Sequence, residues 1–557
     1  MDVAVKTDQC DAGLDEQPST NEKSSAWRQV VANLRDEDKT PLVQLLLQVI
    51  EEQAQRIAAL DAEIVHLKGG PKKPASNRKP SALSKPARVT RVDGKRPGSE
   101  KRSKTKDLPI HEEMPIPPKE LPTGSTLVHR DPYVVQDLLV EARNTRYWLE
   151  TWQTPTGHRS RGELPAGIRG HFGAGLYSFV LQQHYAAHVP QCRILEELRD
   201  FGVDISAGQI NHILTEDKDV FHEEKAELLT AGLASAPYIQ VDDTGARHRG
   251  NNGYCTQIGN EFFAYFASTD SKSRLNFLTV LRGTHGDYEI NEIAAAYWKK
   301  YELAAALIAS LQEGPTHFVD AAAWNAHLQT LGVTGARLVR IATEGALLGS
   351  LIAHGVSVDL CVLSDGAGQF NILAHAACWV HAERPLARMI PHNEEHRLAI
   401  EQVRQQIWEL YQDLKRYRQQ PQPAQVPVLT DRFEAVCAQR TVYPSINNVL
   451  HEMHEHQADL LRVLERPEVP LHNNAAESDI RDYVKKRKIS GSTRSDDGRR
   501  CRDTFASLKK TCRKLGIRFW DYLQDRIRGL GKIPRLAEVI RQRAAESTAG
   551  KAEAVPT

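Results

Sequence analysis

Residues 237–267 read PYIQVDDTGARHRGNNGYCTQIGNEFFAYFA, and this stretch decides the class of fold. The apolar run at its start ends in Asp242, and two strand-like runs, 254–258 and 261–267, follow it. The pair Gly259-Asn260 lies between these two runs and is a hairpin signal. The stretch therefore predicts a buried strand that ends in a carboxylate and lies beside a β-hairpin.

A second buried-strand pattern lies much later in the chain, in the apolar run 356–363. It stops at Ser364-Asp365-Gly366, so a carboxylate again ends a strand. The sequence HAACWVHAERPL follows and predicts a helical stretch ending near Leu386. This alternation favours an α/β core built on a mixed or parallel sheet with helices on its faces. We place this core at 234–495, with large helical insertions at about 287–355 and 393–467.

A third carboxylate lies in residues 472–492, HNNAAESDIRDYVKKRKISGS, for which we predict a helix. Glu477, Arg481, Lys485 and Lys488 follow one another at spacings of four, four and three, so they share one helical face. A carboxylate can hold a divalent cation, and neighbouring cations can neutralise phosphates, which suits an enzyme that cuts a nucleic-acid backbone. The alternative is a solvated helix with ordinary ion pairs.

The net charge of +1 hides two strongly basic segments. Residues 68–106 hold 14 Lys and Arg against two acids, and residues 481–543 hold 20 against seven, so the rest of the chain is acidic. Basic segments of this kind bind phosphate backbones without reading sequence. The alternative for the first segment is a solubilising linker.

Composition narrows the class of protein. The chain of 557 residues is 41% hydrophobic and 26% charged, and its eight cysteines are scattered without a CxxC pair. Residues 1–20 show no cationic and apolar leader, and the apolar stretch 345–358 is too short to span a bilayer. We expect a soluble protein without a membrane partner, cytoplasmic and associated with the nucleoid when it is bound to DNA.

Several modules are expected around the core. Apolar residues between 43 and 67 recur at alternating spacings of three and four, which is typical of a coiled coil that would pair two copies of the chain. Residues 189–214 are compatible with a helix-turn-helix whose second helix begins near Ala207. The expected order is a disordered tail at 1–25, a helical coiled coil at 26–68, a basic flexible linker at 69–122, a helical and possibly DNA-binding domain at 123–233, a basic helical region at 496–541 and a disordered tail at 542–557.

The two strand-end aspartates and the helical glutamate can converge at one edge of the sheet. Mg²⁺ prefers hard oxygen ligands of this kind, and two such ions support an in-line phosphoryl displacement. A rival for the second acid is Asp320, which ends a strand-like run in HFVDAAAW. We favour Asp365, because the CWVH sequence that follows it matches the resemblance described next.

Three sets of motifs resemble one family in the same order. They are VDDTG at 241–245, SDGAGQF leading into CWVHAERPL at 364–386, and HNNAAES-IR with RK, GS and the later SLKKTCRKLG. Together they resemble bacterial transposases of the insertion-sequence-sixty-six type, within the DDE superfamily. The segment from GIRGHFGAGLYSFV to GVDIS resembles the family's central domain, and the expected coiled coil and basic arm resemble its amino terminus, so the resemblance covers most of the chain.

The resemblance implies a ribonuclease-H-like catalytic fold, two Mg²⁺ ions, with Mn²⁺ as a substitute, and cleavage and joining of the double-stranded DNA ends of a mobile element. Asp242, Asp365 and Glu477 match the three metal-binding acids. Arg481 matches an arginine that can contact phosphate. The remaining candidates are Lys485, Lys486, Arg487 and Lys488 for DNA binding, and Asn473, Asn474, Asp243, Trp379 and His381 in supporting roles.

The sequence also departs from the family. Members often carry a cysteine-rich segment before the central domain, whereas residues 147–164 contain no cysteine, and His472 stands where the family usually has an acid. The function predicted is that of a DNA transposase. Two alternatives stay open: a metal-dependent nuclease of the same fold without strand transfer, and a non-catalytic, transposon-derived DNA-binding protein.

Overall fold

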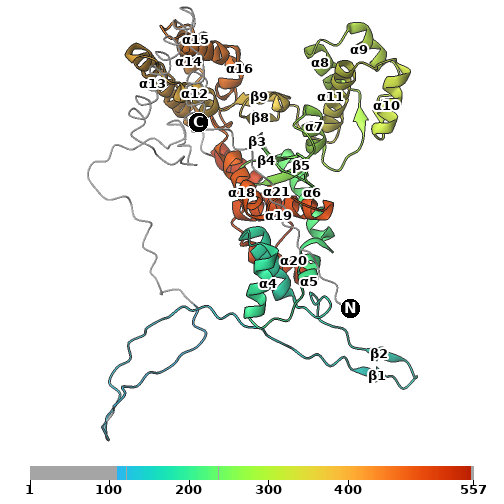
Figure 1. Cartoon of the computed structure of the whole chain (residues 1–557), viewed down its shortest axis with the longest axis vertical. Coiled ribbons are helices and arrows are strands. Elements are labelled where there is room, and N and C mark those ends of the chain that lie inside the picture. The colour runs from blue at the N-terminus through green and yellow to red at the C-terminus, as the bar shows by residue number, and fades with distance from the viewer. Residues whose placement is uncertain (1–108, 121, 236, 554–557) are drawn as a thin grey trace, which may run out of the picture. The chain divides into compact units, whose positions relative to one another are not determined.

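The computed structural model describes residues 109–120, 122–235 and 237–553 (Figure 1). The predicted tail at 1–25, the coiled coil at 26–68 and most of the basic linker lie outside these residues. In the part of the chain that is described, no helix combines the length and the apolar character needed to cross a membrane.

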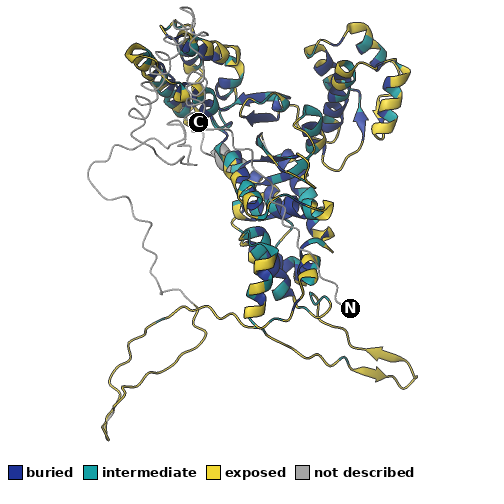
Figure 2. Cartoon of the chain, in the orientation of Figure 1, coloured by how far each residue is buried: buried dark blue, intermediate teal, exposed yellow. Residues whose placement is uncertain are grey.

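The residues before the first helix are extended and exposed (Figure 2). Strands β1 (Thr151–Gln153) and β2 (Arg159–Arg161) pair in an antiparallel hairpin around the turn residues Pro155 and Gly157. The expectation of a helical domain at 123–233 therefore differs from the structure up to residue 173. A helix is stabilised mainly by burying an apolar face, and this stretch has almost no buried residue.

The helical part begins at Ala174. It consists of α3 (Ala174–Leu181), the π-helix η3 (Gln182–Ala186), α4 (Gln191–Asp200), α5 (Ala207–Thr215) and α6 (Asp219–Ser235). Helix α5 starts at the residue predicted for the second helix of the helix-turn-helix. Ser206 caps it, because its hydroxyl accepts a hydrogen bond from the Gln209 amide at 3.1 Å.

A five-stranded mixed sheet forms the centre of the described chain. Its strands are β3 (Tyr238–Gly245), β4 (Tyr254–Gly259), β5 (Ala264–Thr269), β8 (Cys361–Ser364) and β9 (Ala374–Ala377), in the order β5-β4-β3-β8-β9. The strands β5, β4 and β3 are antiparallel, and β8 and β9 run parallel to β3. The prediction of an α/β core with a mixed sheet is confirmed.

Three strand boundaries differ from the prediction. The hairpin turn takes up residues 260–263, since the Asn260 side chain accepts hydrogen bonds from the amides of Phe262 and Phe263, and β5 starts only at Ala264. Strand β8 starts at Cys361 rather than at 356. Residues 375–377, predicted as the start of a helix, belong to strand β9, because they complete the sheet beside β8; the helix expected to end near Leu386 begins only at Trp379.

The first insertion connects β5 to β8. It holds α7 (Arg274–Arg282), β6 (Tyr288–Glu289), α8 (Glu292–Lys300), α9 (Ala305–Gln312), β7 (His317–Phe318), α10 (Ala321–Thr330) and α11 (Ala336–Ala353). It is not wholly helical, because β6 and β7 form a separate two-stranded sheet. The short helix η4 (Gly368–Phe370) lies between β8 and β9.

The second insertion is helical and has its own hydrophobic core. Its elements are α12 (Trp379–Arg388), α13 (Glu394–Gln419), α14 (Gln425–Cys437), α15 (Pro444–Glu455), α16 (Gln457–Leu460) and α17 (Arg462–Glu465). Ile407, Leu414 and Leu450 are fully buried in this core. The core is separate from the larger cluster that includes the sheet residues Ile239 and Val241.

Four helices complete the chain: α18 (Asn474–Ser490), α19 (Asp496–Lys514), α20 (Phe519–Arg528) and α21 (Leu536–Glu553). Helix α18 packs on β3 and β4, α19 packs on β5, and α21 packs on α6. A disordered tail was expected from 542, but α21 continues to Glu553, and Ile540 and Ala544 are buried. Contact with α6 gives this helix the apolar partner that the sequence pattern did not reveal.

Candidate active site

The structure brings Asp242 and Asp365 to the same edge of the sheet. Strands β3 and β8 are parallel neighbours, and Gln240 pairs with Leu363. Continuing this register by two residues sets Asp242 level with Asp365, which follows the last residue of β8. Parallel neighbours end at a common edge, so the two carboxylates belong to one site.

Glu477 joins these two aspartates from the first turn of α18, which packs on β3. The electrostatic effect is visible at Asp242. Burial, together with the carboxylates of Asp365, Asp243 and Glu477, raises the pKa of Asp242 from its usual 3.8 to about 7, although the hydrogen bond from the Asp243 backbone N–H opposes this rise. A partly buried group of mutually repelling carboxylates favours a bound cation.

Glu477 is held by cations from two helices. Its Oε2 accepts a hydrogen bond from Arg481 Nη2 at 2.6 Å, and its Oε1 lies 3.4 Å from Arg384 Nη2 and 3.6 Å from His381 Nε2. Burial and the neighbouring Arg384 lower the pKa of His381, although the Glu477 charge acts in the opposite direction. Arg384 was not predicted, and it brings a second guanidinium, from α12, to the carboxylate of the third acid.

Asn473 fixes the start of α18 against β3. Its side chain is fully buried, and its Nδ2 donates a hydrogen bond to the Val241 carbonyl oxygen at 2.7 Å, one residue before Asp242. Its backbone N–H donates to Cys378 Sγ at 3.2 Å. Asn474, by contrast, is the first residue of α18 and is half-buried. Asn473 therefore couples the position of Glu477 to that of Asp242.

Replacing Asn473 by alanine is expected to lower the free energy of unfolding by about 1–3 kcal/mol, because the buried Val241 carbonyl loses its partner. Asn474→Ala is the matched control and is expected to change stability by less than about 0.5 kcal/mol. Chemical denaturation of both variants measures the difference. Equal losses in the two variants would contradict the role given to Asn473.

Asp243 faces a separate set of partners. One of its carboxylate oxygens pairs with Lys272 Nζ, and the other accepts a hydrogen bond from Gln369 Nε2 at 2.8 Å. Lys272 and Gln369 come from the loop after β5 and from η4, and neither was predicted. Asp243 is therefore neutralised by a lysine of this protein, whereas the Asp242 carboxylate accepts a hydrogen bond from the Asp243 backbone amide.

The loop that carries Asp365 is supported by a chain of buried hydrogen bonds. Asp365 Oδ1 accepts from the Ala367 amide at 3.1 Å, and Ser364 Oγ accepts from the Gly366 amide at 3.1 Å. Ser364 Oγ also lies 2.8 Å from His375 Nε2, and His375 Nδ1 lies 2.9 Å from Asp459 Oδ2 on α16. Both Ser364 and His375 are buried, so the chain holds the loop rather than meeting a substrate.

The rival acid Asp320 has a different role in the structure. It follows β7, which pairs with β6 and is not part of the five-stranded sheet. Its side chain caps α10 by accepting a hydrogen bond from the Ala323 amide at 2.8 Å. The geometry thus groups Asp365, and not Asp320, with Asp242.

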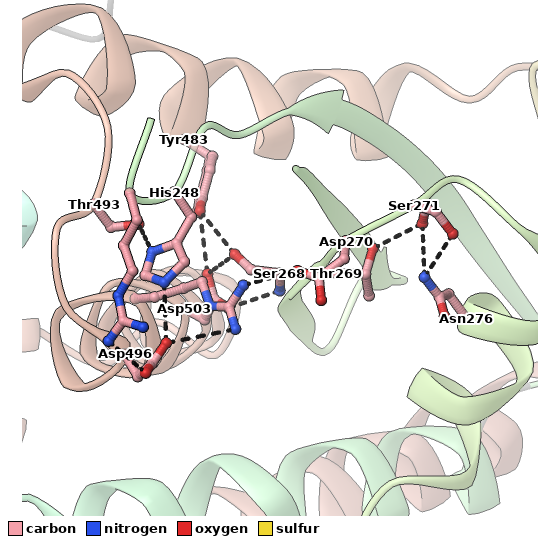
Figure 3. Close-up of polar contacts among 12 residues, drawn as sticks. His248, Ser268, Thr269, Asp270, Ser271, Asn276, Tyr483, Thr493, Asp496 and Asp503 are labelled. Carbon is pink, nitrogen blue, oxygen red and sulfur yellow. Dashed lines mark hydrogen bonds and ion pairs between the residues drawn. The ribbon is translucent and has the colours of Figure 1, made fainter. Parts of the chain in front are cut away.

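A polar network holds the far end of α18 to the sheet (Figure 3). The buried Asp503 on α19 accepts hydrogen bonds from the Ser268 amide at 2.7 Å, the Ser268 hydroxyl at 2.9 Å and the Tyr483 hydroxyl at 3.2 Å. His248, in the loop after β3, lies 2.8 Å from Thr493 Oγ1 and 3.0 Å from Asp496 Oδ1. With Asn473 at one end and this network at the other, α18 is fixed along its length.

Comparison with known proteins places the chain in a family. Residues 169–286 and 356–500 match the model of the Transposase IS66 family. The chain belongs to this family. An uncharacterized protein of Sinorhizobium fredii, y4jO, is 43% identical over 303 residues, which cover 54% of this chain and 94% of that protein. The two matched parts contain Asp242, Asp365 and Glu477 and leave out 287–355, which run from just before β6 to just after α11.

The cations predicted to bind DNA in this family member divide into two groups. Arg481, Lys485 and Lys488 are exposed. Lys486 is buried, and its Nζ donates a hydrogen bond to the His184 carbonyl oxygen at 2.6 Å. Burial, together with Arg502 and Lys509, lowers the pKa of Lys486 to about 7. The assignment of Lys486 to the DNA contact is wrong, because this side chain extends from α18 into the protein and contacts η3.

Arg487 also turns toward the protein. Its Nη1 donates to the Gly245 carbonyl oxygen and lies 3.3 Å from Thr244 Oγ1, so it fastens α18 to the end of β3. Further along, Lys509 pairs with Asp482, Lys514 pairs with Asp479 at 2.7 Å, and Arg526 pairs with Glu224 at 2.8 Å. Part of the positive charge of 481–543 is thus used in internal ion pairs.

Trp379 does not line the site. It is the first residue of α12, is fully buried, and donates a hydrogen bond from Nε1 to the Leu460 carbonyl oxygen at 2.8 Å. Its ring packs near Tyr411 and Phe433 in the core of the second insertion. The supporting role predicted for Trp379 is therefore structural, and it is the next turn of α12, with His381 and Arg384, that faces Glu477.

The donor set of the three acids fits divalent cations. All donors are carboxylate oxygens, and Asp242 is half-buried among like charges that a cation would neutralise. In the described residues, the three do not form a group whose ligand atoms all lie within 4.8 Å of one another. Bound divalent ions would supply Lewis-acid stabilisation of a phosphodiester displacement there, with Asp242, Asp365 and Glu477 as the residues that would hold them.

Metal-free protein with Asp242→Asn is expected to be more stable than the wild type at pH 8, by roughly 2–4 kcal/mol, and by less than half as much at pH 5. The folded state holds the Asp242 proton more tightly than the unfolded chain does. Wild-type stability therefore falls as the pH rises from about 4 to the folded pKa of about 7, and stays lower above it. Asparagine at position 242 does not ionise, so the variant does not show this fall in stability with pH.

Thermal unfolding at the two pH values, without divalent ions, measures the effect. Asp270→Asn is the matched control, since its carboxylate is 90% exposed. A stability difference for Asp242→Asn that is the same at pH 5 and pH 8 would contradict the raised pKa.

Proposed function

We propose that this protein is a DNA transposase that cleaves the ends of a bacterial insertion sequence and joins them to target DNA. The observation that carries the proposal is the convergence of Asp365 and Glu477 on Asp242, in a chain of the IS66 family. The mixed sheet with helices packed on it supports a ribonuclease-H-like catalytic core.

The three acids are proposed to hold two Mg²⁺ ions, or Mn²⁺ in their place. When bound, such ions activate the attacking oxygen and stabilise the leaving oxygen of a phosphodiester displacement. Asp242 belongs at the centre of the set, because the charges of both other acids act on it. Cleavage would free a 3′-hydroxyl at the element end, and this hydroxyl would then attack the target strand.

The side chains around the acids have positioning roles in this proposal. Arg384 and Arg481 contact the two oxygens of the Glu477 carboxylate. When a metal ion binds this carboxylate in their place, both guanidinium groups become free to pair with a DNA phosphate. Arg481 is 66% exposed, so it can reach a backbone without rearrangement of α18. Lys485 and Lys488 extend the same exposed face along the helix.

The partner is double-stranded DNA, both element ends and target, in the cytoplasm at the nucleoid. Pairing of two copies through residues 26–68 would bring two ends together, and the basic segment 69–106 would add contacts to the backbone. The helix pair α4 and α5 is a further candidate for DNA contact, in keeping with its helix-turn-helix spacing.

Incubation of the purified full chain with DNA carrying the terminal repeats of its own element tests the proposal. We expect cleavage at the repeat ends and joined products with Mg²⁺, and binding without cleavage with Ca²⁺, which adopts a larger and looser coordination shell. Cleavage without joining would indicate the nuclease alternative. Binding without cleavage in every divalent ion would indicate a non-catalytic DNA-binding protein.

A further inference from the structure

Five metal-ligating side chains gather in the first insertion, apart from the three acids. They form two overlapping groups, His285 with Asp287 and His354, and Asp287 with Glu289 and His317. Within each group the ligand atoms all lie within 4.8 Å of one another. The shared carboxylate of Asp287 is buried, whereas the three histidines are exposed. A buried acid surrounded by accessible imidazoles is a donor set open to ions from solution.

These residues lie where the chain enters and leaves the insertion. His285 and Asp287 directly precede β6 on the way in, and His354 follows the last residue of α11 on the way out to β8. The stretch that the family model leaves unmatched, 287–355, has its two ends at this group. An ion bound here would link the segment that enters the insertion to the segment that leaves it.

The geometry at Asp287 is close to that of two ligands on one ion. His354 Nε2 lies 2.9 Å from Asp287 Oδ1 and 3.0 Å from Oδ2. Ligand atoms of a tetrahedral zinc ion are about 3.3 Å apart, so a shift of a few tenths of an ångström would admit the ion. The rings of His285 and His354 stack with their centroids 3.5 Å apart at an angle of 14°, so the second imidazole lies beside the first and one ring must turn before both can point at the same ion.

The backbone around the group is already fixed. A Cβ on Gly349 of α11 would lie 2.2 Å from the Glu289 carbonyl oxygen, so only glycine allows the helix to approach β6 this closely. Asn291 Nδ2 donates to the Gly349 carbonyl oxygen at 3.0 Å, and Ser350 Oγ donates to Asp287 Oδ2 at 3.2 Å. The ligands therefore need little ordering before they bind an ion.

Local charge also favours a cation. His354 caps the carboxyl end of the 18-residue helix α11, the negative end of its dipole. Arg282 donates to the Asp287 carbonyl oxygen rather than to its carboxylate.

We propose that His285, Asp287 and His354 bind one divalent transition-metal ion of the zinc class, which links the two ends of the first insertion. Two imidazole nitrogens and a carboxylate suit zinc, whereas magnesium prefers oxygen ligands throughout. Glu289 and His317, paired across β6 and β7 with 2.6 Å between His317 Nδ1 and Glu289 Oε1, lie next to the shared carboxylate and flank the fourth position. The ion has a structural role and is separate from the ions of strand cleavage.

Zinc titration of the metal-free full chain in competition with a chromogenic chelator tests the proposal. Excess Mg²⁺ is kept present so that the three acids are occupied. We expect one Zn²⁺ per chain, and Co²⁺ in its place should give the visible absorption of a tetrahedral site. His354→Gln and His285→Gln are each expected to weaken binding at least about tenfold. Zn²⁺ should also raise the unfolding temperature of the wild type but not of these variants.

Two matched variants serve as controls. His158→Gln replaces an exposed histidine of the β1–β2 connection, and Glu477→Gln removes a carboxylate of the candidate active site. Both are expected to bind Zn²⁺ as the wild type does. Absence of stoichiometric binding, or binding that both His285→Gln and His354→Gln retain, would overturn the proposal, as would binding lost in Glu477→Gln.

Discussion

The Glu477→Gln variant is expected to bind element ends as the wild type does and to cleave them at least about a thousandfold more slowly. Glutamine keeps the size of the side chain and an oxygen that can accept the Arg481 hydrogen bond, but it removes the anionic ligand. Loss of several kcal/mol of charge stabilisation in the transition state corresponds to a rate loss of roughly 10³-fold or more.

Cleavage is measured on end-labelled DNA, and binding is measured by fluorescence anisotropy at fixed salt. Glu465→Gln on α17 is the matched control, because that carboxylate is 70% exposed and pairs with Arg462 of the same short helix. It should cleave within about threefold of the wild type. If Glu477→Gln cleaved equally fast, Glu477 would be an ion-pairing residue and not a ligand.

Asp365→Asn is likewise expected to lose at least about a thousandfold in cleavage, while Asp320→Asn keeps wild-type cleavage. Asp365 lies level with Asp242 on the neighbouring parallel strand and contributes to its raised pKa. Asp320 follows β7, which pairs with β6 in a separate sheet, and it caps α10. Asparagine is as good an N-cap as aspartate, so the Asp320 variant should also keep its stability.

The Asp365→Asn and Asp320→Asn variants distinguish a metal ligand from a residue that only caps a helix. Asp320→Ala extends the comparison, since loss of the cap should cost about 1 kcal/mol of stability without loss of cleavage. Thermal unfolding and the cleavage assay are run on all three proteins. Loss of cleavage in Asp320→Asn with cleavage retained in Asp365→Asn would exchange their assignments.

The three candidate acids were predicted from the sequence because each follows a pattern that depends on local structure. Asp242 and Asp365 end apolar runs, and parallel strands then bring them together; Glu477 begins a helix rich in cations. Arg384 was missed, although it lies three residues after His381, because only the burial of Trp379 in the second core shows which face of α12 meets Glu477.

Lys486 shows the limit of reading charge from composition. It stands in a run of four cations, but its helical phase matches Ile480 and Tyr483, which are buried. Lys272 and Gln369 come from a loop and a single short helical turn, where no periodic pattern marks the direction of a side chain. Contacts of this kind depend on tertiary packing, which brings Asp243 to both of them.

The strands, too, were predicted correctly only where local sequence signals determine them. The antiparallel strands β3, β4 and β5 were predicted to within a few residues, because the Gly-Asn turn and the apolar runs are local signals. Strand β9 was predicted as a helix, since its short apolar run leads directly into α12 and a four-residue strand has too little length to show a period of two.

The buried chain from Ser364 through His375 to Asp459 has a consequence for anyone who wishes to trim this protein to a minimal catalytic domain. Asp459 belongs to the second insertion, and the loop it supports carries Asp365. Excision of residues 393–467 would strip His375 of its partner and would also expose Trp379, whose indole bonds to Leu460. We therefore expect removal of the insertion to disorder the loop that carries Asp365, and a shortened chain to keep this loop only if it retains α16.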